Sequence, residues 1–366
     1  MTPPPQTFDE DKFEIIHQVG GIRTATFDHP DAGGTPACRV AMVDTGAGLR
    51  FTVAIDRGGD IVEASHNGLN LAYLSANGYK PPNPAYHRDG EWTVGWPGGL
   101  VTSCGPQYIG SAREEDGAHI GQHGHHSNTP AALLAVCNPD LRRNEHEMRL
   151  DMAIRDTRLF GPIVEVRRTI RATLGIPAFT IEDQITNRGN KTVAHNWLYH
   201  VNFGYPLLDT GARLVYRGNF HCAWGATMPQ RPDPQTLDRF KTMSDPLDAH
   251  AGPNEDGIII DAVAEDDGLA RIGIVNTQRN VGLEMRFSPE ELPRLANWRH
   301  LAHAGSYVTA LEPFHGSLMG KANDDHPLAE QWLKPGETRS YTLTFHALEG
   351  ETALNNLLTT DSAVTV

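Results

Sequence analysis

Cysteine and basic residues are scarce in this sequence. The four cysteines, Cys38, Cys104, Cys137 and Cys222, include no Cys-x-x-Cys pair of the kind found in redox motifs and zinc ribbons. We therefore expect reduced thiols, most of them in the core. Lys and Arg number 31 against 45 Asp and Glu, and the resulting net charge of −14 repels a phosphate backbone. Nucleic acid is thus excluded as a partner, and a small uncharged ligand is favoured.

Long apolar runs and targeting signals are missing as well. No stretch approaches the roughly 18 uninterrupted apolar residues that cross a membrane, and the start, MTPPPQTFDEDKFEII, lacks basic residues followed by an apolar run. We expect a cytoplasmic protein with no membrane partner. The Pro-rich, acidic residues 1–12 indicate a flexible arm. Residues 13–366 are expected to form a single β domain, which the sequence leaves free to assemble as a homo-oligomer.

Long amphipathic helices are also absent, and apolar residues instead alternate with polar ones. Leu49, Phe51 and Val53 share one face of an extended segment, and the Asn67-Gly68 step predicts a β-hairpin with a type I′ turn. Further strands are expected at residues 148–154, 164–166, 179–181, 257–263, 270–276, 281–287, 307–313 and 341–348. The sequence predicts an all-β fold of two large antiparallel sheets packed face to face, with one or two short helices.

The best helix candidate is the segment 288–298. Ser288 can cap its first turn, Pro289 takes the first helical position and Glu291 completes a capping box. Pro293 limits the length of this helix.

Two segments are rich in tryptophan and histidine. Trp92 and Trp96 flank a Gly-rich bend, where they form either a stacking surface for a sugar ring or core aromatics at a tight strand corner. His119 and the segment 121–130 place four histidines within eight residues. This pattern fits metal ligands, a ligand hydrogen bond from His123, or solvated loop histidines. No carboxylate follows a few residues downstream to complete a metal site.

Two other segments contain a candidate acid and base. His200 shares a strand face with Leu198 and Asn202, and an imidazole with a pKa near neutrality suits a ring-opening proton transfer. Glu312 lies between apolar neighbours at the end of a strand, where burial raises the pKa of a carboxyl group toward that of a useful base. The alternative for Glu312 is a solvent-facing position or an ion pair with Arg299.

The motifs of several enzyme classes are absent. The sequence contains no Gly-x-Ser-x-Gly elbow, no Gly-x-Gly-x-x-Gly after a strand and no phosphate-binding Gly-x-x-x-x-Gly-Lys-Ser/Thr. The sequence therefore contains none of these motifs that would indicate a hydrolase or a nucleotide-binding protein.

The motifs that are present resemble those of the aldose 1-epimerase (galactose mutarotase-like) superfamily, and most closely a bacterial branch of it. The resemblance rests on Asp56-Arg57-Gly58, residues 97–105 (PGGLVTSCG), His123-Gly124 with residues 127–130 (SNTP), residues 199–204 (YHVNFG) and Leu311-Glu312-Pro313. It runs through most of the chain. Where familiar mutarotases carry His-Thr-Tyr-Phe-Asn-Leu, this sequence has HVNFGY at residues 200–205, so the resemblance does not identify the sugar.

This resemblance implies a β-supersandwich whose concave face binds a free sugar. His200 then corresponds to the general acid on the ring oxygen, and Glu312 to the base that takes the proton of the anomeric hydroxyl. Their side chains are expected to face one cavity, about a sugar ring's width apart, with Arg57 and His123 at its rim. The expected substrate-binding residues are Arg57, His123, Asn202, Trp298 and Arg299. No cofactor or metal is expected.

Three functions follow from these residues. The leading hypothesis is an aldose 1-epimerase-like isomerase that interconverts the anomers of a free sugar by acid–base catalysis. The second is a sugar isomerase or keto-sugar lyase that uses the same pocket, with or without a metal on His123, His125 and Glu312. The third is a non-catalytic carbohydrate-binding protein in which tryptophans such as Trp298 stack on sugars.

Overall fold

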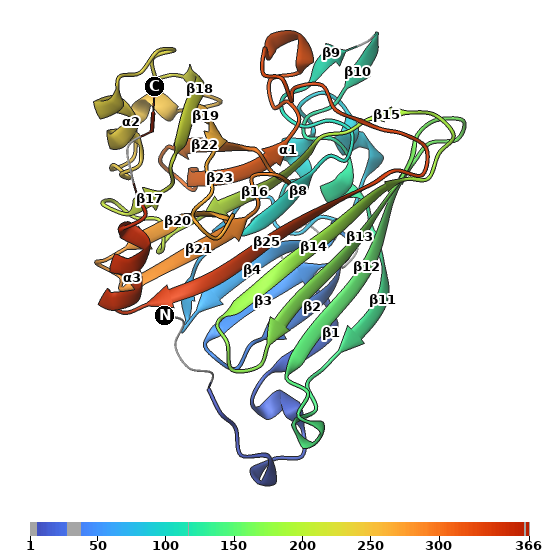
Figure 1. Cartoon of the computed structure of the whole chain (residues 1–366), viewed down its shortest axis with the longest axis vertical. Coiled ribbons are helices and arrows are strands. Elements are labelled where there is room, and N and C mark those ends of the chain that lie inside the picture. Colours follow the sequence, from blue (N-terminus) through green and yellow to red (C-terminus); the bar gives the residue numbers. More distant parts are fainter. Residues whose placement is uncertain (1–5, 28–37, 116, 362–363, 366) are drawn as a thin grey trace.

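Two large antiparallel β-sheets pack face to face (Figure 1). The structure is a computed structural model, which describes residues 6–27, 38–115, 117–361 and 364–365. Both sheets contribute to one main cluster of buried apolar side chains that lies between them. The predicted all-β architecture of large packed sheets is therefore confirmed.

The larger sheet contains the strands that carry the candidate acid and base. In spatial order it consists of β1 (Gly21–Phe27), β2 (Cys38–Asp44), β3 (Leu49–Ala54), β4 (Asp60–His66), β8 (Val101–Cys104), β16 (Trp197–Phe203), β23 (Tyr307–His315), β22 (Arg294–Leu301), β19 (Asp256–Ala262) and β18 (Gly218–Gly225), with β5 (Leu69–Asn70) paired to β4. Strands β16 and β23 lie in the middle of this order, so ladder hydrogen bonds fix both of them on each side.

The second sheet covers the first. Its order is β11 (Ala131–Cys137), β12 (Glu147–Thr157), β13 (Ile163–Thr173), β14 (Ala178–Asn187), β25 (Thr338–Glu349), β21 (Val281–Phe287), β20 (Ala270–Asn276) and β17 (Arg213–Val215). Three small pairs complete the described strands: β6 (Tyr73–Leu74) with β7 (Gly98–Gly99), β9 (Arg113–Glu115) with β10 (Ala118–Ile120), and β15 (Val193–Ala194) with β24 (Trp332–Leu333).

The alternating pattern places the predicted side chains in the core. Leu49, Phe51 and Val53 of β3 are buried in the main cluster, and so are Met148 and Leu150 of β12. The other expected segments also coincide with strands, although β12, β13, β14 and β25 each extend at least three residues beyond a predicted bound. Period-two reasoning works here because one face of each sheet is buried and a one-residue shift in register would expose the apolar set.

The Asn67-Gly68 hairpin is confirmed. Asn67 and Gly68 have φ angles of 48° and 83°, and they connect β4 to β5 with Ser65 opposite Asn70. A type I′ turn requires positive φ at both central residues, which Asn and Gly adopt at the lowest cost.

The predicted helix at residues 288–298 is wrong. Ser288 O accepts the backbone N–H groups of Glu291 and Leu292 in a single turn, and the chain from Arg294 onward forms β22. Pro293 ends the turn, and β22 then pairs with β19 and β23 on its two sides. Ladder pairing and burial therefore outweigh a good helix start.

Helices do occur elsewhere in the described chain, at positions that the sequence pattern did not identify. They are α1 (Trp92–Gly95), α2 (Pro234–Phe240) and α3 (Glu351–Leu358), with 3₁₀ turns at Glu10–Lys12, Ile16–Gln18, Pro84–His87, His126–Asn128, Leu141–Arg143, Asp248–His250 and Lys321–Asn323. Helix α2 lies in the Pro-rich stretch between residues 228 and 253. Asp233 caps it by accepting the N–H of Thr236, and Pro234 is its first residue.

The N-terminal residues only partly fall within the described chain. Residues 1–5 of the expected arm lie outside it. Of the remainder, Gln6 donates its N–H to Gly175 O at 3.0 Å, and Phe8 packs against the main core. No helix among the described residues is long and apolar enough to span a membrane.

The four cysteines are free thiols, as predicted. Cys38 and Cys104 are buried, whereas Cys137 and Cys222 are half-buried.

Candidate active site

A cavity of about 740 Å³ opens over the centre of the larger sheet. Its walls come from strands β16, β22 and β23 and from the loops around residues 75–77, 92–96, 252–255, 304–306 and 318–319. A volume of this size holds a ligand of one or two sugar rings. His123, His200, Trp298 and Glu312 all line it, so the structure brings these four predicted residues together.

The cavity exists because small residues alternate with large ones across the strands. Gly257 of β19 lies between Trp224 of β18 and Trp298 of β22, and Ala296 lies opposite Glu312. A Cβ atom on Gly257 would come within 2.1 Å of the Trp224 ring. The missing side chain therefore lets the Trp224 indole lie directly over the strand at this position.

His200 projects from β16 toward this cavity. On the opposite face of the strand, Tyr199 and Val201 enter the main core, and β16 pairs with β23 so that Leu198 lies opposite Phe314. This register puts His200 beside Glu312, with His200 Nε2 at 3.4 Å from Glu312 Oε1. The expected separation of about a sugar ring's width is wrong, because the strands that carry the two side chains are direct neighbours.

Burial without a compensating charge favours the neutral forms of both groups. His200 is 5% exposed and Glu312 is 2% exposed. Burial lowers the pKa of His200 well below its usual value, and the nearby His123 lowers it further. Burial also raises the pKa of Glu312 well above its usual value, with a second contribution from the charge of Glu255. Both shifts favour a protonated carboxyl group beside a neutral imidazole.

His123 completes a cluster of three ionisable groups. Its ring centroid lies 5.6 Å from that of His200. Burial, and then the charge of Arg113, lowers the pKa of His123 to about 4. The N–H of Gly110 points at His123 Nδ1 from 3.4 Å, an arrangement that leaves the proton on Nε2. His123 is thus a neutral hydrogen-bond donor facing the cavity.

Four indole rings surround these groups. Trp92 and Trp96 stack with their centroids 5.0 Å apart, and Trp96 Nε1 donates to Thr102 Oγ1 at 2.9 Å. Trp298 meets the ring of His200 edge-on at 5.4 Å, and Trp224 lines the wall beside it. Of the two alternatives stated for Trp92 and Trp96, the structure shows both features, because each ring is partly or fully buried and also faces the cavity.

Asn202 supports the site from the side without lining it. Its Nδ2 donates to His200 O at 2.9 Å and to Gly99 O at 3.2 Å. These bonds join β16 to the glycine-rich turn and hold the backbone that carries His200.

Arg57 and Arg299, two of the predicted substrate-binding residues, do not reach the cavity. Arg57 is buried and donates to Asn128 Oδ1 at 3.1 Å. Arg299 follows Trp298 on β22, so alternation turns it to the opposite face, where it donates to Asp256 Oδ2 at 3.2 Å and stacks on Phe240. A residue that directly follows a cavity-lining residue on a strand points to the opposite face of the sheet.

The metal-binding alternative finds no support in the part of the chain that the structure describes. His125 turns away from His123 and Glu312 to meet Asp156, with 3.1 Å between His125 Nδ1 and Asp156 Oδ1. The set of potential ligand atoms that do converge is His221, Asp324 and Asp325, which lies outside the cavity lining.

Glu255 is a site residue that sequence reasoning missed. It lies in the loop before β19 and lines the cavity wall. Trp224 Nε1 donates to its Oε1 at 3.1 Å, and Trp298 Nε1 donates to its Oε2 at 2.7 Å. The only local signal is Gly257 two residues later, which admits both indoles, and nothing in the sequence distinguishes this glycine from those in ordinary turns.

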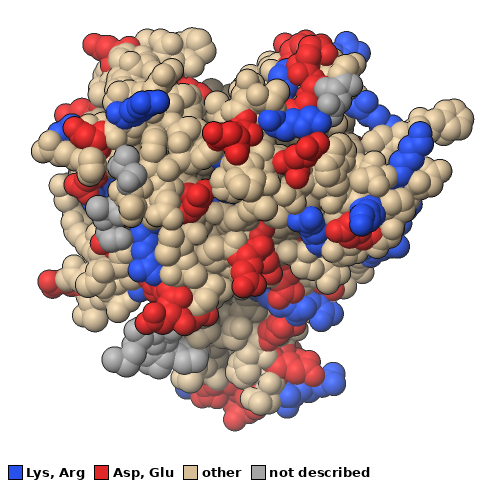
Figure 2. All heavy atoms as spheres, turned by 45° about the horizontal axis from the view of Figure 1, so that its top comes forward, with Lys and Arg blue, Asp and Glu red and all other residues tan. Residues whose placement is uncertain are grey.

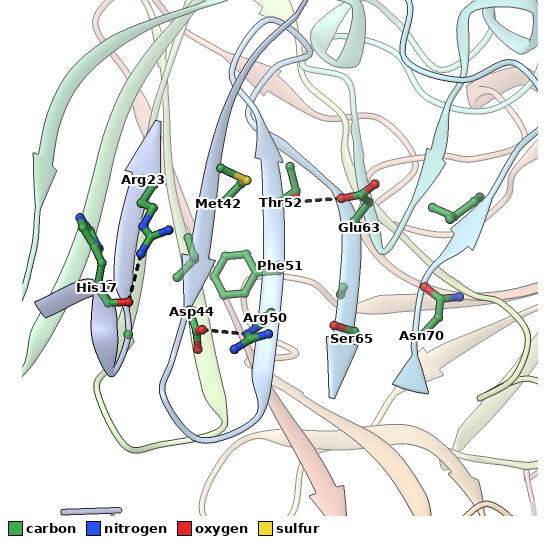
Figure 3. Close-up of a pocket in the computed structure, with 15 residues that line it drawn as sticks. His17, Arg23, Met42, Asp44, Arg50, Phe51, Thr52, Glu63, Ser65 and Asn70 are labelled. Carbon is green, nitrogen blue, oxygen red and sulfur yellow. Dashed lines mark hydrogen bonds and ion pairs between the residues drawn. The ribbon is translucent and has the colours of Figure 1, made fainter. Parts of the chain in front are cut away.

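A second hollow, of about 670 Å³, lies on the exposed face of strands β1–β5 (Figure 3). Its ionisable side chains are exposed or half-buried, and both of its arginines already have hydrogen-bond acceptors. Arg50 donates to Asp44 Oδ2 at 2.8 Å, and Arg23 donates to His17 O at 3.0 Å. This hollow therefore lacks a buried acid and base, and the active-site candidate is the cavity at His200.

A family model matches residues 36–347, and its description is a domain of unknown function, DUF4432. The chain belongs to the DUF4432 family. This DUF4432 chain is similar in fold to a candidate aldose 1-epimerase from Klebsiella pneumoniae subsp. pneumoniae, with 21% identity, a TM-score of 0.79 and coverage of 94% of this chain and 89% of that one.

Two other solved structures extend the likeness of the DUF4432 chain. A Synechocystis protein is 17% identical at a TM-score of 0.61, covering 88% of this chain and all 100% of that one. A galactose mutarotase-like protein from Clostridium acetobutylicum is 12% identical, with a TM-score of 0.58 and coverage of 91% of this chain and 100% of that one. These likenesses confirm the galactose mutarotase-like fold. The comparison with curated proteins finds no match.

Proposed function

We propose that this protein is an aldose 1-epimerase-like isomerase that interconverts the anomers of a free sugar. The observation that carries the proposal is the buried contact between His200 and Glu312, 3.4 Å apart at the floor of an indole-lined cavity. Apolar ring faces suit the C–H faces of a sugar, and the acid–base pair suits its reacting centre. The fold shared with a candidate aldose 1-epimerase supports the same function.

The pair holds one mobile proton, and this is what anomer exchange needs. The anomeric hydroxyl and the ring oxygen are bonded to the same carbon, so two catalytic groups in contact with each other can reach both oxygens. Burial favours the protonated form of Glu312 and so makes it the proton donor of the pair. Glu312 then protonates the ring oxygen while neutral His200 accepts the hydroxyl proton, which reverses the roles implied by the sequence resemblance.

Ring opening and closure follow from this transfer. The C1–O5 bond breaks, C1 becomes an aldehyde, and rotation about C1–C2 presents its other face. Closure returns each proton to the group that supplied it, so the cycle needs no cofactor. His123, a neutral donor beside His200, is placed to stabilise the ring oxygen as charge develops on it.

Magnetization exchange between anomers tests the proposal directly. Purified protein is added to equilibrated aldoses, and NMR saturation transfer between the two anomeric protons is measured for wild type, Glu312→Gln and the exposed control Glu290→Gln. Accelerated exchange with wild type and the control, and its loss in Glu312→Gln, is the expected result. Sugar binding without any exchange would instead support the carbohydrate-binding alternative.

A further inference from the structure

The described lining of the active-site cavity contains acidic side chains and no Lys or Arg. Among the described residues that line it, Glu255 and Glu312 are acidic, and none is Lys or Arg. The residues outside the described ranges contain no Lys or Arg either. Two of the three imidazoles on its wall are His123 and His200, whose lowered pKa values favour their neutral forms. The third, His300, directs its ring nitrogens at Ser306 O and Gly252 O, at 3.1 and 2.8 Å, and not into the open cavity. A negatively charged ligand therefore meets no Lys or Arg side chain inside the cavity.

Arg113 and Arg299 are already bonded to other groups. Arg113, whose charge acts on His123, donates to Glu115 Oε2 at 2.7 Å and to Ile109 O at 2.9 Å. Arg299 is paired with Asp256 on the far face of β22. The face of the molecule in Figure 2 likewise shows acidic and basic side chains interspersed, without a continuous basic area. Neither Arg113 nor Arg299 is therefore available to offset the charge of Glu255 inside the cavity.

Glu255 is held as a fixed acceptor at the cavity wall. Each of its two carboxylate oxygens accepts one indole N–H, from Trp224 at 3.1 Å and from Trp298 at 2.7 Å. Indole N–H groups are neutral donors, so they orient the carboxylate without cancelling its charge. Each oxygen keeps a further lone pair for a ligand hydroxyl or ammonium group.

We infer that the cavity selects sugars without an anionic substituent, that it accepts amino sugars, and that Glu255 is the specificity-determining residue. The inference deepens the proposed function, because it assumes that the ligand is a free sugar. A phosphate, carboxylate or sulfonate would lose its hydration and face Glu255 in a cavity of low polarity, where like charges repel strongly. An ammonium group would form favourable contacts with both the Glu255 carboxylate and the adjacent indole faces.

Equilibrium binding to a charge series tests this inference independently of turnover. Dissociation constants are measured by titration calorimetry for glucose, glucosamine in its protonated form, glucuronate and glucose 6-phosphate, and for the corresponding galactose series. The proteins are wild type, Glu255→Gln, Glu255→Asp and the exposed control Glu290→Gln. Wild type and the control are expected to bind the neutral and amino sugars at least about tenfold more tightly than the anionic ones.

The Glu255 variants show which residue is responsible. Glu255→Gln is expected to reduce the difference between amino and anionic sugars by about tenfold, whereas Glu255→Asp, which keeps the charge, retains the order. Equal wild-type affinity for neutral and anionic sugars, or an order unchanged in folded Glu255→Gln, would overturn the inference. Failure of every sugar to bind would overturn both proposals. Binding in the expected order without anomer exchange would overturn only the isomerase.

Discussion

The two faces of strand β16 bury ionisable groups in opposite ways. On the core face, the Tyr199 hydroxyl donates to Asp183 Oδ2 at 2.7 Å, and Arg168 forms an ion pair with the same carboxylate at 2.7 Å. On the cavity face, His200 and Glu312 are almost as deeply buried but have no cation beside them. The carboxylate of Asp183 raises the pKa of Arg168, whereas burial without a cation raises the pKa of Glu312 and favours its protonated form.

Under the proposed function, this difference distinguishes a structural pair from a reactive one. A buried charge with a geometrically matched partner is costly to disturb and has no free proton to exchange. A buried acid without such a partner retains a proton that a ligand can receive, which is why strongly shifted groups in a cavity indicate function. Burial is similar on the two faces, and the main difference is the charged partner.

The largest effect is expected when the cavity face loses its proton donor. Glu312→Gln keeps the shape of the side chain but cannot transfer a proton, so kcat for anomer exchange should fall by about 100- to 10,000-fold. Sugar affinity, measured by titration calorimetry, should change little. Wild-type kcat in a folded Glu312→Gln protein would remove Glu312 from the mechanism.

A substitution on the core face of β16 should instead lower the stability of the protein. Asp183→Asn leaves Arg168 buried without a counter-charge, and the free energy of unfolding should decrease by about 3–5 kcal/mol in a denaturant titration. The fraction that remains folded should keep its kcat. Glu14→Gln, which breaks the exposed pair with Arg142, is the matched control and should leave stability unchanged. A large loss of kcat with normal stability would show that the core pair takes part in the chemistry.

Stability as a function of pH gives a further contrast. The folded-state pKa of Glu312 is raised. The folded chain therefore keeps a proton on Glu312 at pH values where the unfolded chain has already released it. Wild type therefore loses stability as pH rises from the unfolded value of Glu312 toward the folded one. Glu312→Gln has no proton to lose at this position. Its free energy of unfolding should therefore increase relative to that of wild type by on the order of 1 kcal/mol per pH unit. Parallel unfolding curves at all pH values would contradict a protonated Glu312.

The smallest predicted effect is a shift in the pH profile of kcat. The charge of Glu255 contributes to the raised pKa of Glu312, so Glu255→Gln should lower that pKa. The alkaline limb of the kcat profile, where Glu312 loses its proton, should then move to lower pH. The acid limb, where His200 becomes protonated, should move less. An alkaline limb that moves upward, or not at all, would show that Glu255 does not act on Glu312 electrostatically.

Sequence reasoning located the strands and the two central residues for identifiable reasons. Alternation reports directly which face of a strand is buried, so Leu49 and His200 were assigned to their correct faces. Glu312 was found because a carboxyl group in an apolar strand is costly without a role. Local patterns are sufficient for such decisions, since they depend only on neighbours along one strand.

The residues that sequence reasoning misplaced depend on contacts across strands. Arg299 follows Trp298 in sequence, but the pleat sends the two side chains to opposite faces of β22. Glu255 reaches the site only because β18, β19 and β22 align Trp224, Gly257 and Trp298 in one row. The segment 288–298 carries a good helix start, yet pairing partners from residues 256–262 and 307–315 made its second half a strand.

The location of β16 and β23 in the middle of the larger sheet has an evolutionary consequence. His200 and Glu312 are carried by backbone that neighbouring strands hold on both sides, whereas much of the cavity wall comes from connecting loops. Loop sequence and length can therefore diverge without moving this pair. Under the proposed function, substitutions or insertions in the loops at residues 75–77, 252–255 and 304–306 are the route by which descendants of this chain would acquire new substrates while inheriting the same chemistry.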